Sequence, residues 1–190
     1  MILELRQYLL RDGQREALID LFDREFVESQ EELGMAVLGQ FRDLDRPDRF
    51  VWLRGFTDMS SRREALAAFY GGPVWKEHGP AANATMIDSD DVLLLRTGRL
   101  PVGARAGSRS PFEILIFYRD RAWPADLALD GALATLHTEY AENTFPRLPV
   151  REGEHALAVL TRPGFTAPDL DGVVRTDHLR LAPTERSALR

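Results

Sequence analysis

The sequence predicts an α+β fold in which two related halves each carry helices on one face of an antiparallel sheet. Three observations favour this fold. Segments with strand and helix periodicity alternate through residues 2–96, a segment rich in Gly, Pro and Arg occupies residues 98–111, and residues 112–190 repeat parts of the first segment in a shorter form. The chain of 190 residues has an apolar content of 44%, which is sufficient for a packed core.

The first half opens with a strand and a helix. Residues 2–10 alternate between apolar and polar side chains and lead to Asp12-Gly13, as a strand closed by a turn does. Residues 14–33 then switch to helical spacing, with the apolar side chains on one stripe. Gly34 follows this stripe and is expected to end the helix.

A hairpin, a second helix and a last strand complete this half. The strand-like runs 35–44 and 49–56 flank a turn-forming cluster and therefore predict a hairpin. Ser60 is placed to cap a second helix, which Gly71-Gly72-Pro73 interrupts, and residues 92–96 form a short strand. The order β-α-β-β-α-β is the ferredoxin-like arrangement, an antiparallel sheet with helices on one face.

An internal repeat indicates that the second half follows the same plan. A shift of 109 positions places Glu113 on Glu4 and Gly164 on Gly55, at equivalent points of the two halves. The closing strands match at a shorter shift of 86 positions. The residues missing from the second half fall where its second helix would be, so we expect this half to be β-α-β-β-β.

These observations divide the chain into three parts. Residues 1–97 are expected to form a ferredoxin-like domain, residues 98–111 an exposed linker, and residues 112–190 a shortened ferredoxin-like repeat. The single helix of the second half is expected to include residues 137–140, and a proline-bent strand is expected around 145–149. We expect the two sheets to pack against each other within one chain.

The composition excludes several classes of function. The net charge of −6 and the absence of any basic run argue against a nucleic-acid partner. Without cysteine, the chain can form no disulfide, thiolate metal site or cysteine nucleophile. No apolar stretch is long enough for a signal peptide or a membrane span, so we expect a cytoplasmic location and no membrane partner. No motif predicts a cofactor.

Six parts of the first half resemble one known family. They are Glu4-Leu5-Arg6-Gln7-Tyr8 leading to Gly13, Leu38-Gly39-Gln40-Phe41, Arg49-Phe50-Val51-Trp52-Leu53, Arg62, the Trp75 that follows Pro73, and Val92-Leu93-Leu94-Leu95. This pattern resembles the NIPSNAP family, within the dimeric α/β-barrel superfamily. The resemblance implies two facing sheets, usually from two subunits. It implies no single reaction, because the superfamily includes cofactor-free oxygenases, haem-handling proteins, cyclases and proteins that only bind.

The third strand departs from the pattern of this family. Members typically carry His, Trp and Tyr at alternating positions of the strand, where this chain has Trp52, Arg54 and Phe56. Chemistry that depends on the strand histidine therefore cannot be carried over to this chain.

Strand alternation brings charged and aromatic residues of the first sheet to one face. The candidate ligand-binding residues are Arg6, Tyr8, Arg42, Trp52 and Arg54. If the helices cover the leucine face, these residues point away from the helices, toward a pocket or the second sheet. One interpretation is a site for an anion or a carbonyl group, with arginine donors and aromatic walls. The other is a set of salt bridges across a polar sheet interface.

Histidine and aspartate residues offer weaker candidates. His78 is the candidate general base, because the second helix can overhang the mouth of a barrel, although a surface histidine would have the same sequence context. The four histidines lack the spacing of metal ligands. Asp88, Asp90 and Asp91 lack the pattern of a calcium loop and indicate a polar turn. We therefore expect no metal site.

Two classes of function stay open. The chain could bind a small aromatic or anionic molecule in a barrel pocket, as a cofactor-independent enzyme, or it could be a non-catalytic binding or interaction scaffold. An enclosed cavity with converging polar groups would favour the first class, and a barrel filled by side chains the second. We also expect a homodimer, because a sheet that lacks one helix leaves apolar surface to be covered.

Overall fold

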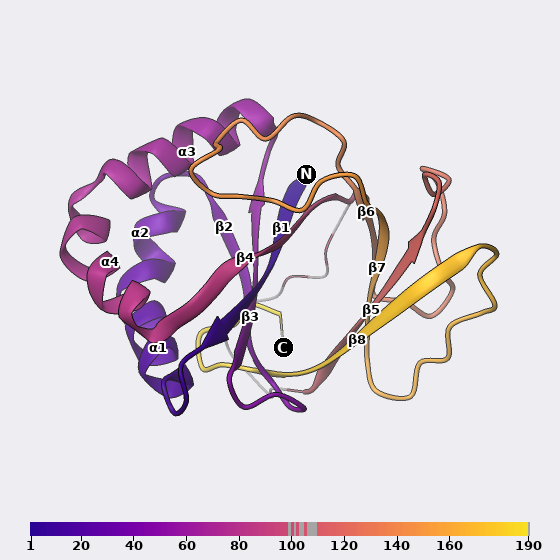
Figure 1. Cartoon of the computed structure of the whole chain (residues 1–190), viewed down its shortest axis with the longest axis horizontal. Coiled ribbons are helices and arrows are strands. Elements are labelled where there is room, and N and C mark those ends of the chain that lie inside the picture. The colour runs from indigo at the N-terminus through magenta and orange to yellow at the C-terminus, as the bar shows by residue number, and fades with distance from the viewer. Residues whose placement is uncertain (99, 101, 103–104, 106–109, 190) are drawn as a thin grey trace.

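Alternating apolar side chains build the strands of this protein, and the strands close into one barrel (Figure 1). The computed structural model describes residues 1–98, 100, 102, 105 and 110–189. Within them, eight strands follow the order β1-β3-β2-β8-β5-β7-β6-β4 around the barrel, and neighbouring strands are antiparallel. The strands are β1 (Ile2–Leu10), β2 (Ala36–Asp43), β3 (Arg49–Phe56), β4 (Met86–Arg96), β5 (Phe112–Arg119), β6 (Ala134–Thr138), β7 (His155–Thr161) and β8 (Val173–Pro183).

The helices of the described residues all precede β4, and they cover the outer face of the first four strands (Figure 1). They are α1 (Arg15–Leu21), η1 (Phe22–Phe26), α2 (Val27–Glu31), α3 (Met59–Gly71) and α4 (Pro73–Thr85). The first three form one continuous segment with a π-helical turn in its middle. None of the helices in this described part of the chain is long and apolar enough to cross a membrane.

The predicted order of elements in the first half is confirmed. Gly34 follows the first helical segment with a φ of 83°, a left-handed conformation that glycine adopts without steric cost. The cap of the second helix is Asp58 rather than Ser60: its carboxylate accepts from the backbone N–H of Ser61, and the Ser61 side chain pairs with the backbone of Asp58.

The prediction of a helix in the second half was wrong. Among the described residues of 112–189 there is no helix, and the segment around His137 forms β6. Leu136 lies in the barrel core, whereas Thr135 and His137 point outward, which is the period-two pattern of a strand. The bent strand expected at 145–149 is a turn, and β6 takes its place.

The strands of the two halves follow the same spatial order. In the first half the order is β4-β1-β3-β2, and in the second it is β8-β5-β7-β6. The halves meet at two seams of the barrel. β2 and β8 share three register pairs, and β4 and β6 share two, whereas β1 and β3 share eight. The seams are therefore the least extensively paired parts of the barrel.

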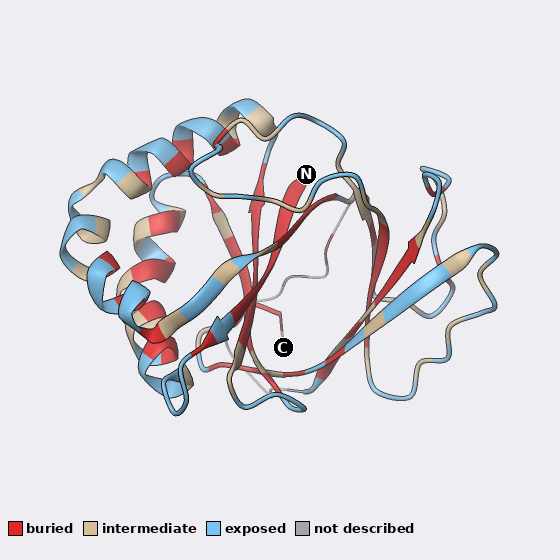
Figure 2. Cartoon of the chain, viewed as in Figure 1, coloured by how far each residue is buried: buried red, intermediate tan, exposed pale blue. Residues whose placement is uncertain are grey.

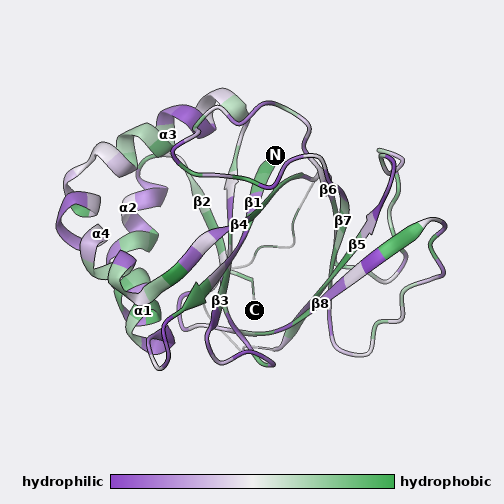
Figure 3. Ribbon diagram, in the orientation of Figure 1, coloured by the Kyte–Doolittle hydropathy of each residue, from purple (hydrophilic) through white to green (hydrophobic). Residues whose placement is uncertain are grey.

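The core has three parts. Aliphatic side chains from both halves fill the barrel interior, and a cluster rich in aromatic residues lies between the helices and the sheet. A smaller cluster covers the outer face of the second half, where loops take the place of helices. Figure 2 shows buried residues along the strands and on the inner sides of the helices, and Figure 3 shows that many of these stretches are hydrophobic.

Most of the segment expected to be a linker, residues 98–111, lies outside the described residues. Of its described residues, Leu100 is buried in the barrel core. Arg105 forms an ion pair with Glu31 of α2, with 2.5 Å between Nη2 and Oε1. Arg105 also donates to the backbone carbonyl of Arg186 at 2.7 Å, so these two residues hold the connection against both halves.

Candidate functional site

A buried carboxylate with three arginines lies between the sheet and the helices of the first half. Glu4 on β1 and Arg54 on β3 are register partners, and the Nε of Arg54 lies 2.8 Å from Oε2 of Glu4. Arg6, two residues further along β1, donates to the same oxygen at 2.8 Å. Arg62 of α3 donates from Nε to the other oxygen, Oε1, at 2.7 Å. Glu4, Arg54 and Arg62 have no solvent-exposed surface, and Arg6 has 1%.

The carboxylate of this cluster remains ionised because of its neighbours. Burial alone would raise the pKa of Glu4, but attraction to Arg54, Arg6 and Arg62 outweighs it. The pKa of this carboxyl therefore lies well below its usual value of 4.5. The cluster holds three guanidinium groups and one carboxylate, so two positive charges have no anionic partner within it.

The remaining partners of the guanidinium groups are neutral. Arg6 donates to the Tyr8 hydroxyl at 3.0 Å, Arg54 to the Gln30 side chain at 3.0 Å, and Arg62 to Asn143 at 2.9 Å. The Nη2 atoms of Arg54 and Arg62 each lie 2.7 Å from Glu4, although outside hydrogen-bonding geometry. These contacts satisfy donors but leave the net charge unchanged.

Aromatic rings surround the charged cluster. The guanidinium of Arg54 lies 5.0 Å from the ring centre of Trp52, and that of Arg6 lies 5.5 Å from Tyr8, distances that allow cation–π attraction. Tyr8 and Trp52 pack edge to face at 6.0 Å. Burial raises the pKa of Tyr8, and the charge of Arg6 opposes that rise, so its phenol is neutral at physiological pH.

A small cavity lies among these rings. Its volume is about 20 Å³, close to that of a single water molecule. The lining residues are Tyr8, Leu18, Phe22, Phe26, Gln30, Trp52, Phe69, Tyr70, Trp75, Ala82 and Met86. We call this space the aromatic pocket. The buried indole N–H of Trp52 has no hydrogen-bond partner among the described residues.

The structure brings together four of the five predicted ligand-binding residues. Arg6, Tyr8, Trp52 and Arg54 form the cluster and its walls, but Arg42 lies apart. Its Nε donates at 2.9 Å to Glu16 of α1, and its side chain is 29% exposed.

The predicted direction of these side chains was wrong, because they face the helices. The opposite face of the sheet, which carries Leu3 and Leu5, fills the barrel interior. The reason is physical: the leucine face meets the aliphatic side chains of the second half. The charged and aromatic face is buried under helices that supply matching polar partners.

The sequence argument did not place Gln30 and Tyr70 in the site, and it used Arg62 only for the family resemblance. A signal for Arg62 was present, since it lies on the same stripe of α3 as the buried Ala65, Leu66 and Phe69. A charged residue on the buried stripe of a helix requires a buried partner.

His78 lies on α4 and does not line the aromatic pocket. Its Nε2 is 3.4 Å from a carboxylate oxygen of Glu25, at the protein surface. No group of three His, Asp or Glu side chains in the described part of the chain could hold a metal ion.

A loop of the second half closes one side of the site. Phe145 stacks on Tyr70 with 5.9 Å between ring centres, and the Thr144 hydroxyl donates to the backbone of Met59. Together with the contact of Asn143 on Arg62, these interactions fasten residues 143–145 over α3. The first-half site is therefore completed by the second half.

The half of the chain that contains this site matches a known protein family. The sequence pattern of the NIPSNAP family matches residues 3–98, which is half of the chain. The chain belongs to the NIPSNAP family. The NIPSNAP region thus covers β1 to β4 and the helices, including Glu4 and its three arginines. No curated protein matches the sequence.

Solved structures are similar to this chain in two ways. A NIPSNAP family protein of unknown function from Agrobacterium tumefaciens is 24% identical over 50% of this chain and 86% of its own, with a TM-score of 0.45. Two longer matches are called putative monooxygenases. The one from Lactobacillus acidophilus is 11% identical over 96% of this chain and 93% of its own, with a TM-score of 0.58. The one from Fusobacterium nucleatum is 9% identical over 96% and 91%, also with a TM-score of 0.58. At these identities the likeness concerns the fold alone.

Proposed function

We propose that this NIPSNAP family protein binds a small aromatic molecule with a negative charge in the aromatic pocket, without a bound cofactor. One observation carries the proposal: three fully buried guanidinium groups share a single carboxylate. A buried charge without a counter-ion is costly, and neutral hydrogen-bond partners offset only part of the cost. A carboxylate on the ligand would supply one of the missing negative charges.

The surroundings of the cluster favour an aromatic body for this anion. Tyr8, Trp52, Tyr70 and Trp75 line the pocket, and ring-shaped ligands stack or pack edge to face against such walls. The guanidiniums of Arg6 and Arg54 lie beside the same rings. An aromatic acid would thus place its ring among the aromatic side chains and its carboxylate beside the arginines.

The ligand can enter only if the pocket widens. A cavity of about 20 Å³ is far smaller than an aromatic acid. Trp75 covers the pocket from α4 and is itself partly exposed, and an extended residue, Gly72, separates α4 from α3. We propose that α4 moves outward with Trp75 when the ligand binds.

A thermal-shift titration tests the proposal. We expect 2-naphthoate or phenylacetate to raise the midpoint of unfolding by roughly 3–6 °C at ten times the Kd, and the uncharged alcohol 2-naphthylmethanol to have little effect. Arg54→Met should abolish the shift. Arg42→Met is the matched control, because Arg42 lies outside the cluster, and it should keep the shift.

A second variant keeps the proposal testable if Arg54→Met does not fold. Trp75→Ala leaves the arginine cluster intact and removes the side chain that covers the pocket. It should still be stabilised by 2-naphthoate, because the arginines and the other aromatic walls remain and the entrance is wider. If no aromatic acid stabilises either protein, the pocket is a structural core and the proposal fails.

Catalysis needs its own test. Two proteins of the same fold are called putative monooxygenases, and oxygen is therefore the first co-substrate to examine. Oxygen uptake should be measured with each aromatic acid that binds. Binding without oxygen consumption or product would assign the pocket a binding role only.

The alternative function is an interaction scaffold, and two observations favour it. The barrel interior is filled with aliphatic side chains, and the aromatic pocket is nearly closed. Over residues 173–180, β8 pairs only with β5 within the described chain, and Val174 on this stretch is 72% exposed. Such an edge can pair with a second copy, as a homodimer would. Sedimentation of Val174→Lys against the unaltered protein checks this, since only a β8-edge dimer would dissociate.

We also propose that residues 1–97 and 112–190 are the two members of a tandem arrangement of ferredoxin-like units, joined by residues 98–111. The identical spatial order of the strands in the two halves supports this proposal. The second unit would then have lost both helices, with loops in their place. Separate expression gives the test: the two fragments, mixed, should reassemble the barrel and recover its cooperative unfolding.

A further inference from the structure

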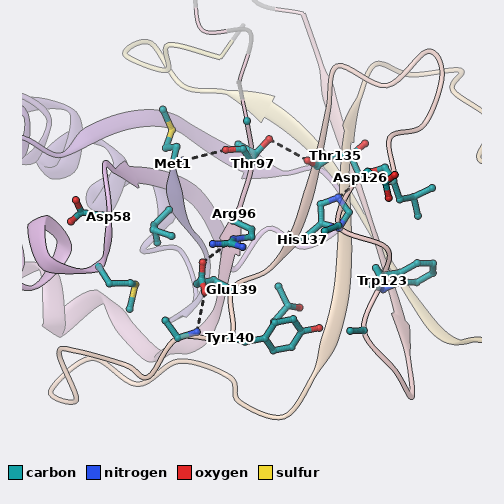
Figure 4. A pocket seen from close by; sticks show the side chains of 18 of the residues that line it. Met1, Asp58, Arg96, Thr97, Trp123, Asp126, Thr135, His137, Glu139 and Tyr140 are labelled. Carbon is teal, nitrogen blue, oxygen red and sulfur yellow. Dashed lines mark hydrogen bonds and ion pairs between the residues drawn. The ribbon is translucent and has the colours of Figure 1, made fainter.

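A large hollow lies on the outer wall of the barrel, away from the aromatic pocket. Its volume is about 1020 Å³, at the upper end of the range for small-molecule sites. It lies beside the β4–β6 seam, between the start of α3 and the loop that contains residues 122–128 (Figure 4). We call it the seam cleft.

The seam cleft exists because residues 112–189, the described part of the second half, form no helix. In the first half, helices cover the outer face of the strands, whereas only loops flank the outer face of β6. The outward side chains of β6 therefore line an open space. Trp123 and Leu127 give this space an apolar side, and Arg96, His137 and Glu139 give it a polar one.

His137 has one ring nitrogen hydrogen-bonded and the other buried without a partner among the described residues. Its Nε2 lies 3.0 Å from the backbone carbonyl of Leu127, and because a carbonyl can only accept, Nε2 carries the proton. Nδ1 is then an acceptor, and this buried atom has no hydrogen-bond partner among the described residues. Burial lowers the pKa of His137, the bond to Leu127 opposes that change, and Arg96 adds to the lowering. The imidazole is therefore neutral at neutral pH.

The charges around His137 disfavour an anionic ligand. Arg96, the register partner of His137 across the seam, is paired with Glu139 at 2.9 Å. Asp58 and Asp126 add two more carboxylates to the lining. Glu139 neutralises Arg96, and the amino group of Met1 offsets one of these two carboxylates, which leaves the cleft with a net negative charge of one.

We propose that the seam cleft binds a small ring compound, neutral or cationic, that donates an N–H or O–H hydrogen bond to Nδ1 of His137. The ring would pack against Trp123 and Leu127, and the donor would satisfy an acceptor that the described residues leave unpaired. Because Nδ1 is buried, the loop that contains residues 122–128 must shift when the ligand binds. This ligand class is opposite in charge preference to the one proposed for the aromatic pocket, so the two sites can be tested separately.

Nitrogen NMR of the histidine rings tests the proposal directly. The unaltered protein should show His137 with its proton on Nε2. Titration with phenol or benzylamine should move the Nδ1 resonance of His137 and leave the nitrogens of His178, which lies outside the cleft, in place. Toluene lacks a donor and benzoate is an anion, and neither should move the His137 signal.

A binding measurement with variants completes the test. His137→Phe keeps a ring of similar size but removes the acceptor, and it should weaken phenol binding roughly five- to tenfold. His178→Phe is the control and should bind as the unaltered protein does. Arg54→Met, which removes the proposed anion site under the helices, should also leave phenol binding unchanged.

Two results would overturn the inference. The first is an Nδ1 signal of His137 that does not respond to any donor compound at millimolar concentration. The second is equal binding of toluene and phenol, which would make the cleft a purely apolar hollow. If His137→Phe fails to fold, the titration of the unaltered protein still decides between these outcomes.

Discussion

Glu4 and Arg54 face each other across β1 and β3 with both side chains fully buried, 2.8 Å apart at their closest hydrogen-bonded atoms. The same carboxylate also binds Arg6 and Arg62. Within this cluster, Glu4 is thus the anion that links β1, β3 and α3 through three cations. Its removal breaks all three ion pairs at once.

Replacing Glu4 by Gln should destabilise the protein strongly. The variant keeps the shape of the side chain but leaves three buried guanidiniums without an anion, and breaking a buried pair in this way costs about 3–5 kcal/mol. Urea unfolding measures the loss. Glu16→Gln is the control, since Glu16 pairs with Arg42 near the surface and should cost no more than ~1 kcal/mol. A loss below ~1 kcal/mol for Glu4→Gln would contradict the structure.

The stabilising effect of Glu4 should disappear in acid. The folded pKa of Glu4 lies below the ordinary value of 4.5, so this contribution is complete above pH 4.5 and is lost as the pH falls further, when the unfolded chain binds a proton that the folded protein does not. The difference in unfolding free energy between the unaltered protein and Glu4→Gln should shrink by up to about 1.4 kcal/mol per pH unit below that value. A difference that stays constant from pH 6 to pH 3 would rule this out.

The phenol of Tyr118 should lose its proton only at high pH. Burial raises its pKa to about 12, although the nearby charge of Arg151 opposes the rise. Because the folded pKa lies above the ordinary value of 10.0, Tyr118 stabilises the fold below pH 10, and this contribution is lost as the pH rises toward 12. Phenolate absorbance should therefore show a step near pH 12 that Tyr118→Phe lacks. The same step near pH 10 would show that Tyr118 is more accessible than it is in this structure.

Gly79 should not tolerate a methyl group. A Cβ at this position would lie 2.7 Å from the indole of Trp75, so Gly79→Ala must displace the ring that covers the aromatic pocket. We expect a loss of about 1–3 kcal/mol and a change in tryptophan fluorescence. Gly71→Ala, at the end of α3, is the matched control, because nothing lies within 4 Å of its added carbon. Equal losses of stability for the two substitutions would show that the contact with Trp75 is not the cause.

The order of elements in the first half could be predicted because period-two and helical spacing are both strong there. The side of the sheet that the helices cover could not be predicted. Both faces of β1 are buried, one through Leu3 and Leu5 and the other through Glu4 and Arg6, and alternation alone does not say which face meets a helix. Arg62 on the buried stripe of α3 was the residue that could have decided it.

The fold of the second half was harder to predict from the sequence, because a short strand there occupies the place of the expected helix. His137 lies in a stretch of only five strand residues, too short for its alternation to outweigh an expected helix. Its pairing with β4 across the seam is a long-range contact that no local pattern contains. For the same reason the seam cleft could not be anticipated, since it depends on the absence of helices from residues 112–189.

The shared barrel interior determines what a shorter version of this chain would do. A fragment that ends after β4 would present Leu3, Leu5 and Leu53 to water, because the side chains that cover them belong to β5–β8. The surface that best matches this exposed leucine face is the same face on another such fragment. Truncation should therefore convert a contact within one chain into self-association, and concentration would control whether the remaining half stays dissolved as a pair or aggregates.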